Sequence, residues 1–297
     1  MTTIAQATRT TKQRQQEDDL RSQIFSIFWQ VIKYAFLIGV TLLWLLPLFA
    51  TVLTSFRTMD DITVNGFWSI PERFTVDKFT QAWDQADIRR YLINSFIITI
   101  PALVGMLFLS SMSAYALARY RFRGNRFIYF TYVAGMMLPF QILLLPVFRL
   151  ANELKIYNTH GALIMIHTAF QLGFCTFVLR NFMRTVPGEI LDAARVDGCG
   201  EFRIFLQIML PLSLPSLAAV ATLEFTWVFN DYLWALFLLS EQQLQPITAG
   251  LATLQGQYHA DWPLITAGAL LATLPTVFLF IFLQRYFIQG LTLGSGK

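Results

Sequence analysis

The stretch from Leu92 to Leu117 reads LINSFIITIPALVGMLFLSSMSAYAL and contains no Asp, Glu, Lys or Arg. A helix needs about twenty such residues to cross the roughly 30 Å of hydrocarbon in a bilayer. Backbone polar groups inside lipid must pair with one another, and a helix satisfies this requirement within a single segment. Residues 92–117 are therefore predicted to form a membrane-spanning helix.

Other apolar runs of similar length occur along the chain, at residues 34–55, 127–148, 161–179, 217–239 and 263–287. Hydrophobic residues make up 55% of the sequence and charged residues 13%, whereas soluble domains carry about 25% charged residues. The formal net charge of +4 is too small to indicate a nucleic-acid-binding protein. We expect an all-α, polytopic membrane protein with six transmembrane helices within residues 34–288.

Basic residues in the short loops indicate the orientation of these helices, because cytoplasmic loops are enriched in Lys and Arg. The loops after the second and fourth runs carry Arg119, Arg121, Arg123, Arg126, Arg180, Arg184, Arg195 and Arg203. The loops after the third and fifth runs carry only Arg149 and Lys155. Both termini are therefore predicted to be cytoplasmic, as tails of residues 1–33 and 289–297.

Polar side chains inside the predicted spans mark a candidate solute path. Glu224 and Asp231 are seven residues apart in the fifth run, a spacing that places them on one helix face, and Asn230 is adjacent to Asp231. Gln171 occupies the fourth run, within one turn of His167. Acids inside a membrane are costly and usually face a cavity or a partner helix. These residues either line a path for a hydroxylated solute or bond one helix to another.

Residue patterns for catalysis, metal binding or nucleotide binding are not found in the sequence. The histidines do not recur at ligand spacing, and the two cysteines lie in different settings, Cys175 in an apolar run and Cys199 in a polar loop. The phosphate-binding pattern G-x-x-x-x-G-K-[S/T] does not occur. We expect no catalytic residue, no metal site and no cofactor bound by this chain, which therefore should not hydrolyse ATP itself.

The loop of residues 180–211 between the fourth and fifth runs is the most informative part of the sequence. Pro187 suits the start of a helix, and Ile190, Leu191 and Ala194 follow at helical spacing. Gly198 can take the left-handed conformation that ends a helix. A second helical stretch follows and ends at Pro211. The loop is predicted to fold as a helix, a glycine turn and a second helix that project into the cytoplasm.

This loop resembles the EAA motif of the permeases of binding-protein-dependent ABC importers. The residues that carry the resemblance keep the spacing of the motif and are Asp192, Ala193, Ala194, Gly198, Ile208, Leu210 and Pro211. The one departure is Asp192, where the motif has Glu. Residues 113–119, 229–232 and 284–294, which read SAYALAR, FNDY and QRYFIQGLTLG, are similar to stretches of the carbohydrate-uptake branch that contains the maltose permeases.

The resemblance implies a type I ABC importer permease fold in the cytoplasmic membrane of a bacterium or archaeon. It further implies a second permease subunit, two ATPase subunits that use ATP and Mg²⁺, and an extracytoplasmic binding protein that delivers a sugar or sugar derivative. The EAA residues would couple the permease to an ATPase through a coupling helix. In maltose-type relatives, the sugar contacts come largely from the other permease subunit.

Three alternatives remain open at this point. One is an ABC permease for a non-sugar solute, against which the QRYF-type ending argues. Another is an ion-coupled secondary transporter, which would be expected to contain inverted repeats or matching interrupted helices. The third is an intramembrane enzyme, but no paired acids, Ser-His set or metal-ligand set indicates one.

Overall fold

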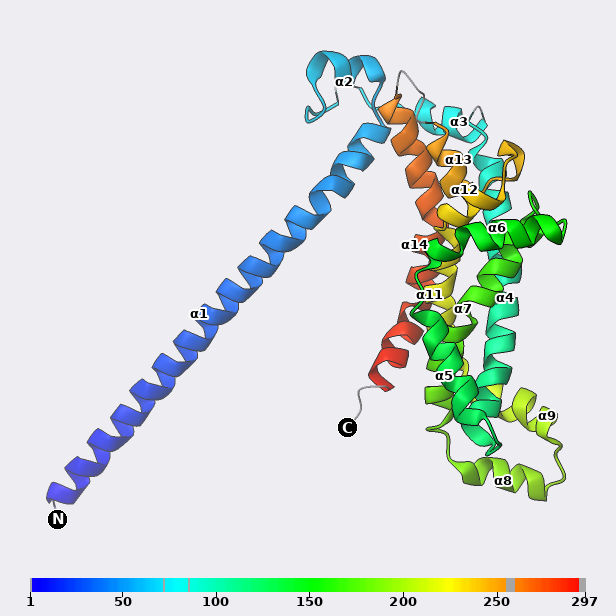
Figure 1. The fold of residues 1–297 in the computed structure, drawn as a ribbon. Helices are drawn as coiled ribbons and strands as arrows, with labels where there is room; N and C mark the ends of the chain where they lie inside the picture. Colours follow the sequence, from blue (N-terminus) through cyan, green and yellow to red (C-terminus); the bar gives the residue numbers. More distant parts are fainter. Residues whose placement is uncertain (1, 72, 85, 255–259, 294–297) are drawn as a thin grey trace.

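The computed structural model describes residues 2–71, 73–84, 86–254 and 260–293, and the regular elements in these ranges are helices (Figure 1). The first half contains α1 (Thr2–Ser55), α2 (Met59–Asn65), α3 (Asp77–Asp84), α4 (Ile88–Arg119), α5 (Asn125–Met136), η1 (Phe140–Leu143) and α6 (Leu144–Glu153). The second half contains α7 (His160–Met183), α8 (Gly188–Val196), α9 (Glu201–Ile204), η2 (Phe205–Met209), α10 (Leu210–Leu212), α11 (Leu214–Phe229), α12 (Leu233–Leu238), η3 (Gln242–Leu244), α13 (Ile247–Ala252) and α14 (Trp262–Leu293). The all-α prediction is confirmed.

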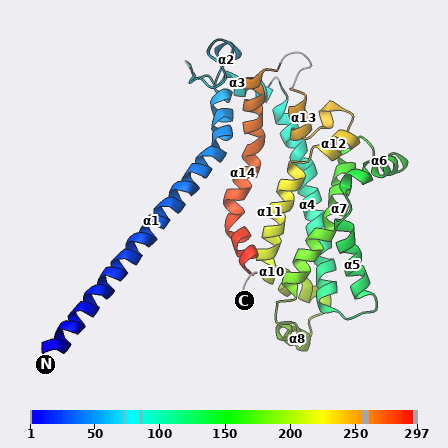
Figure 2. The same cartoon turned by 60° about the vertical axis from the view of Figure 1, so that its left-hand side comes forward.

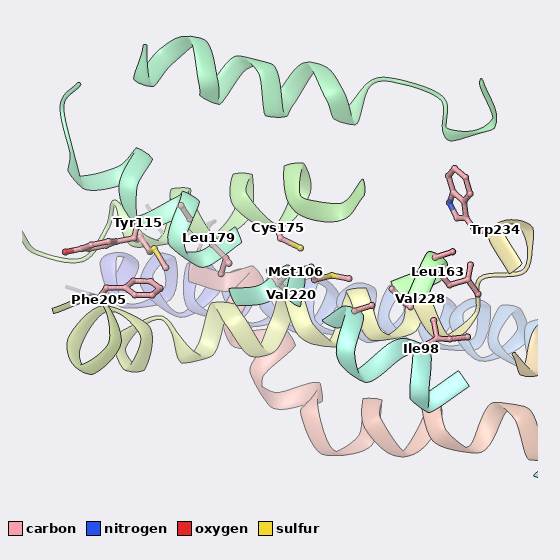
Figure 3. Close-up of a cluster of buried hydrophobic side chains, with 14 of the residues drawn as sticks. Ile98, Met106, Tyr115, Leu163, Cys175, Leu179, Phe205, Val220, Val228 and Trp234 are labelled. Atoms are coloured by element: carbon pink, nitrogen blue, oxygen red, sulfur yellow. The ribbon is translucent and has the colours of Figure 1, made fainter. Parts of the chain in front are cut away.

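The centre of the molecule is a bundle in which α4 and α7 make the most extensive helix contact. Small residues allow these backbones to approach closely, since Ser110 and Ala114 of α4 are fully buried. Larger side chains such as Met106, Leu179 and Val220 fill the space between α4, α7 and α11 (Figure 3). This core fixes the positions of the two ends of the bundle, which carry different loops.

Helix α1 stands apart from the bundle and approaches it only near its C-terminal end, where it meets α14 (Figures 1 and 2). Its apolar side chains are exposed from Phe25 to Phe49. The apolar part long enough to cross a membrane is Phe25–Ser55. The helix begins at Thr2, so residues 2–33 of the predicted tail are helical and continuous with the first span.

Continuous helices cover three of the other predicted spans. Helices α4, α7 and α14 contain residues 92–117, 161–179 and 263–287 respectively. Helix α14 continues to Leu293, so the first part of the predicted tail at 289–297 is helical. Residues 294–297 of that tail lie outside the described residues.

The third predicted span, residues 127–148, is bent and not straight. Helix α5 and the segment Phe140–Glu153 meet at 93°. Pro139 precedes η1 and has no N–H to donate to a helix, and it also disfavours the helical conformation of the residue before it. The bend turns α6 across the end of the bundle (Figure 1).

The fifth predicted span, residues 217–239, is also interrupted. Helix α11 begins at Leu214 and ends at Phe229, and α12 follows after a short break. At the other end, the segments Glu201–Leu212 and Leu214–Phe229 are bent by 74°. Four helices of the described residues are long and apolar enough to cross a membrane, and the number rises to six when each bent pair counts as one span.

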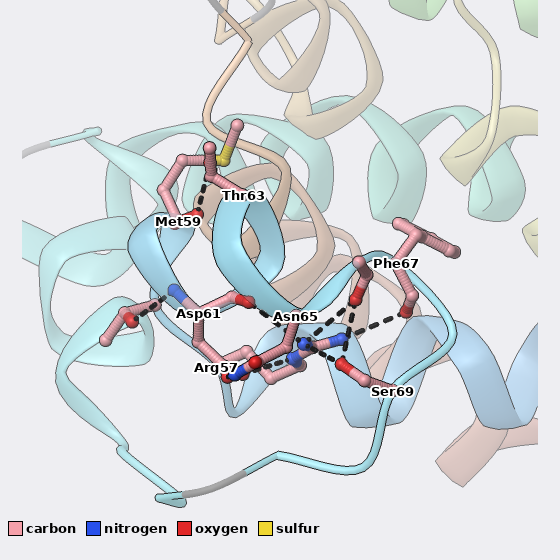
Figure 4. Close-up of polar contacts among 9 residues, drawn as sticks. Arg57, Met59, Asp61, Thr63, Asn65, Phe67 and Ser69 are labelled. Carbon is pink, nitrogen blue, oxygen red and sulfur yellow. Dashed lines mark hydrogen bonds and ion pairs between the residues drawn. The ribbon is translucent and has the colours of Figure 1, made fainter.

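The loop after α1 folds around a buried arginine (Figure 4). The guanidinium of Arg57 is fully buried and pairs with Asp61 Oδ2 at 2.5 Å. It also donates to the carbonyl of Phe67 at 2.9 Å and to Ser69 Oγ at 2.6 Å. Buried charges persist only when they are paired in this way, so this loop is a defined structure at the end of the bundle opposite α8 (Figure 1).

Candidate functional site

A cavity of about 670 Å³ opens beside the break between α11 and α12. Its walls come from η1, α7, α11, α14 and the break itself. The lining residues are Phe140, His167, Phe170, Gln171, Thr222, Leu223, Thr226, Trp227, Asn230, Asp231, Tyr232, Leu233, Trp234 and Phe280. Three of the residues that the sequence assigned to a solute path, Gln171, Asn230 and Asp231, therefore share one cavity.

The polar side of the cavity is organised by Asp231. Its carboxylate accepts hydrogen bonds from the backbone N–H groups of Trp234 and Ala235, at 3.4 and 3.2 Å, and so caps the start of α12. His167 Nε2 of α7 lies 3.7 Å from Asp231 Oδ2. Asn230 ends α11 and donates to the carbonyl of Thr226 at 2.8 Å. The break in the helix thus places an acid, an amide and an imidazole at one wall.

The cavity also has aromatic lining residues. The Trp234 ring lies 6.2 Å from Phe140 and 6.3 Å from Phe170, and Trp227 exposes most of its indole. The sequence pattern does not distinguish these aromatic residues, because aromatic residues are common in every apolar run. Pockets that combine apolar walls with a few placed polar groups bind small molecules. This cavity can accept a molecule that has both apolar faces and hydrogen-bonding groups.

Glu224 does not line this cavity. It is buried in α11, its carboxyl group lies against the Cys175 thiol of α7, and its Oε2 atom has no hydrogen-bond partner among the described residues. The prediction that Glu224 and Asp231 share a helix face is wrong, because α11 ends at Phe229 and Asp231 is no longer on the helix.

The loop of residues 180–211 forms a projection at the far end of the bundle, with α8 at its tip (Figure 1). Leu191 and Ala194 are buried against the bundle, while Ala193 and Val196 are exposed, Val196 to 88%. Asp192 exposes 71% of its side chain. The tip therefore presents a small residue, an apolar residue and a carboxylate to its surroundings.

Helix α8 ends in a glycine turn, as the sequence indicates. Gly198 has φ of 80°, the left-handed conformation. Gly198 N–H bonds to the carbonyl of Arg195, and Cys199 N–H bonds to the carbonyl of Ala194 at 2.9 Å. This pair of bonds is the Schellman arrangement that satisfies the last carbonyls of a helix. The motif residues Ile208, Leu210 and Pro211 lie beyond the tip, in η2 and α10, where the chain returns towards α11.

Glu201, in the loop of residues 180–211, connects α8 to the end of α4. Its carboxylate accepts hydrogen bonds from the hydroxyls of Tyr115 and Tyr120, at 3.1 and 2.5 Å. Arg195 of α8 donates to Glu201 Oε1 at 2.7 Å and to Asp192 Oδ1 at 2.6 Å. The hydrogen bond from Arg195 is the main reason that the pKa of Glu201 is lowered to about 2. We call these five residues the Glu201 network.

The other side of the loop is held by Arg119, the last residue of α4. Its guanidinium donates to the backbone carbonyls of Met183 and Val186, which connect α7 to α8. The end of α4 therefore contacts the loop both before α8, through Arg119, and after it, through the Glu201 network. Residues 113–119 resembled a family stretch, and the fold gives that stretch a physical role.

Interrupted spans, a cavity beside the α11–α12 break and a projecting loop are features expected of a polytopic membrane permease. Residues 106–293 match the family model described as "Binding-protein-dependent transport system inner membrane component". The chain belongs to this family.

Named relatives agree with this family assignment. The chain is 40% identical, over 84% of its length and 90% of the relative, to the arabinooligosaccharides transport system permease protein AraQ of Halalkalibacterium halodurans. It is 32% identical, over 85% of its length and 91% of the relative, to the melibiose/raffinose/stachyose import permease protein MelC of Bacillus subtilis. The relatives are named as permease proteins, so this chain is a transport component and not an enzyme.

The fold is also similar to that of a solved importer. A chain from the crystal structure of a bacterial ABC transporter involved in the import of the acidic polysaccharide alginate superimposes with a TM-score of 0.78. The match covers 88% of this chain and 96% of that chain, at 19% sequence identity. The predicted type I ABC importer permease fold and the multi-pass location in the inner membrane are confirmed.

Proposed function

We propose that this chain is one of two permease subunits of an importer that carries a sugar or sugar derivative, and that the solute passes through the cavity beside the α11–α12 break. The cavity is the observation that carries this proposal. Sugars present apolar C–H faces and many hydroxyl groups, which suit its aromatic wall and the polar groups of Gln171, Asn230 and Asp231. The relatives that import arabino-oligosaccharides and melibiose-type sugars support this substrate class.

The loop of residues 180–211 couples the permease to an ATPase subunit in this proposal. The exposed tip of α8 offers Asp192, Ala193 and Val196 to a partner, while buried Leu191 and Ala194 hold the helix on the bundle. The turn at Gly198 and the return through Ile208, Leu210 and Pro211 fix the angle of the tip. Two ATPase subunits would bind ATP and Mg²⁺, a binding protein would deliver the solute outside, and both termini would lie in the cytoplasm.

The uptake of labelled sugars by cells that carry a deletion of the gene tests the proposal. An arabino-oligosaccharide, raffinose and diacetylchitobiose serve as probes, and the deletion should abolish the uptake of at least one of them. In the complemented strain, Gln171→Ala and Trp227→Ala should each lower that uptake about fivefold, because each removes one contact worth about 1 kcal/mol.

Thr131→Ala is the matched control, since Thr131 is exposed on α5 and its hydroxyl bonds only to its own helix, at the carbonyl of Phe127. All three variants must reach the membrane at the wild-type level. Normal uptake by both cavity variants would show that the solute path lies elsewhere. Normal uptake of all three sugars by the deletion strain would contradict the sugar assignment.

A further inference from the structure

A basic groove of about 1170 Å³ lies at the end of the bundle that carries the loop of residues 180–211. We call that loop the coupling loop, after its proposed role. The lining residues of the groove come from the end of α4, the turn between α4 and α5, the first turn of α5 and the last turns of α7. Figure 2 shows where these helices lie in the bundle. The described lining residues of the groove include six arginines and no acidic residue, and the arginines are Arg119, Arg121, Arg123, Arg126, Arg180 and Arg184.

Two of these arginines build the wall of the groove. Arg119 donates to the carbonyls of Met183 and Val186. Arg180 donates to the carbonyl of Leu117 at 3.3 Å, and its guanidinium lies 3.9 Å from the centre of the Tyr129 ring. These contacts join α4, α5 and α7 at the rim of the groove. They leave both guanidinium charges without a carboxylate partner among the described residues.

The other four arginines, Arg121, Arg123, Arg126 and Arg184, are exposed. Within the part of the chain that the structure describes, none of them forms a hydrogen bond or an ion pair. Like charges gathered in one concave surface repel one another. An anion in the groove would relieve this repulsion and could accept several charge-assisted hydrogen bonds.

Exposed aromatic side chains next to the arginines distinguish a lipid from a soluble anion. Phe122 and Phe127 line the same groove, and Phe127 is 76% exposed. Phe130 continues this apolar surface one turn further along α5, in the direction of the bundle centre. A phosphate ion would contact only the arginines, whereas a phospholipid would place its headgroup on them and its acyl chain along α5.

We propose that this groove binds the headgroup of an anionic phospholipid of the cytoplasmic leaflet. Basic pockets between transmembrane helices on the cytoplasmic side hold such headgroups. The choice of leaflet rests on the proposed function, which places the coupling loop in the cytoplasm. Because Arg119 lines the groove and also holds the start of the coupling loop, the bound lipid fixes the α4–α5 turn against that loop.

The test is photo-crosslinking of the purified importer complex in nanodiscs. One sample contains a photoactivatable phosphatidylglycerol and another contains the matching phosphatidylcholine, each as a minor component, and labelling is quantified by mass spectrometry on peptides within residues 120–135. The phosphatidylglycerol probe should label these peptides at least tenfold more than the phosphatidylcholine probe. The preference should weaken with added salt, since the headgroup is held by exposed charges.

The variant R121Q/R123Q/R126Q should lose most of this preference. The matched control is R73Q/R89Q/R90Q, which removes three exposed arginines at the opposite end of the bundle and should keep it. Equal labelling by the two probes, or an unchanged preference in the groove variant, would overturn the proposal. So would complete loss of labelling in millimolar inorganic phosphate, which would identify a site for a free anion.

A pull-down of the ATPase subunit separates a lipid occupant of the groove from a protein occupant. If the groove variant keeps its lipid preference but no longer retains the ATPase in a pull-down, the groove is a protein contact and the lipid proposal is wrong. Crosslinking requires no transport, so its failure would leave the sugar-uptake proposal untouched. Loss of sugar uptake in the cavity variants would likewise not affect the lipid result.

Discussion

At the scale of single residues, the most constrained position in the coupling loop is Gly198. Its φ of 80° is a conformation that a residue with a Cβ atom adopts only at a cost. A Cβ added to Gly198 would meet no atom within 4 Å, so the cost of a substitution comes from the backbone alone. Gly200, two residues later, also has open space around it but has φ of −70°.

Gly198 and Gly200 therefore allow a prediction with a matched control. Gly198→Ala should destabilise the end of α8 by about 1 kcal/mol and raise amide hydrogen exchange in residues 188–196 roughly fivefold. Gly200→Ala should leave exchange unchanged. Equal effects of the two substitutions, or none from Gly198→Ala, would show that the left-handed turn does not hold the tip.

The contacts of Asp192 differ from what its motif position alone indicates. The sequence suggests a lone contact charge at the motif position usually held by Glu. In the folded chain Asp192 shares Arg195 with Glu201, so its carboxylate is partly neutralised although it is exposed. A partner would therefore meet a charged cluster and not an isolated acid. The Asp192–Arg195 pair lies within α8, whereas the Arg195–Glu201 pair, six residues apart, depends on the turn at Gly198, and spacing alone did not reveal it.

At the scale of elements, the Glu201 network joins the end of α4 to α8. A carboxylate whose pKa is lowered to about 2, from 4.5, stabilises the folded form when it is ionised. The stabilisation is fully present above about pH 4.5 and is lost as the pH falls through the folded pKa near 2. The network should therefore stay intact across neutral pH.

Glu201→Gln should loosen α8 at pH 7 and uncouple ATP hydrolysis from transport. Solute-stimulated ATPase activity of the reconstituted complex measures the coupling, and hydrogen exchange in residues 188–196, corrected for intrinsic rates, measures the loosening. Lowering the pH from 5 to 3 should loosen α8 in the wild type and have less effect in the variant. Arg203→Gln is the control, because Arg203 bonds to Gln207 in the adjoining η2 and not to the Glu201 network. A variant with normal coupling would show that the network is structural only.

Two of the predicted spans, the third and the fifth, are not single straight helices. The third apolar run continues past Pro139, and the fifth continues past Asn230 and Asp231. Hydropathy therefore predicts one full membrane span in each run. The bends depend on particular groups. Pro139 cannot donate a hydrogen bond to a helix, and the Asp231 carboxylate instead caps α12. Residues of the α11–α12 break line the cavity, and a count of apolar residues could not have predicted it.

At the scale of the whole molecule, the two ends of the bundle differ in how their basic residues are paired. The described lining of the groove contains six arginines and no acid, while at the opposite end Arg57 pairs with Asp61, Lys78 with Asp261 and Arg90 with Asp87. The enrichment of cytoplasmic loops in Lys and Arg predicts that the arginine-rich end faces the cytoplasm. The orientation of the chain remains a prediction, and it can be measured directly.

Single cysteines in a background where Cys175 and Cys199 are replaced should report this orientation. Gln243→Cys, between α12 and α13, should react with a membrane-impermeant maleimide in intact cells. Asp197→Cys, at the tip of the coupling loop, should react only in inverted vesicles. Both positions are exposed, so a difference reflects the side of the membrane and not burial. The reverse pattern would mean that the coupling loop faces outward.

The sequence by itself determined the features that depend on composition and local spacing. Long apolar runs specify membrane helices because lipid offers no partner to a free backbone group, and the glycine turn after α8 follows from the conformational freedom of Gly198. The tertiary structure alone decided which side chains converge. Asp231 lines the cavity while Glu224 is buried against Cys175, and Tyr115 and Tyr120 reach Glu201 across more than eighty positions of chain. Such contacts depend on how helices bend and pack, and packing is a property of distant residues that no local pattern encodes.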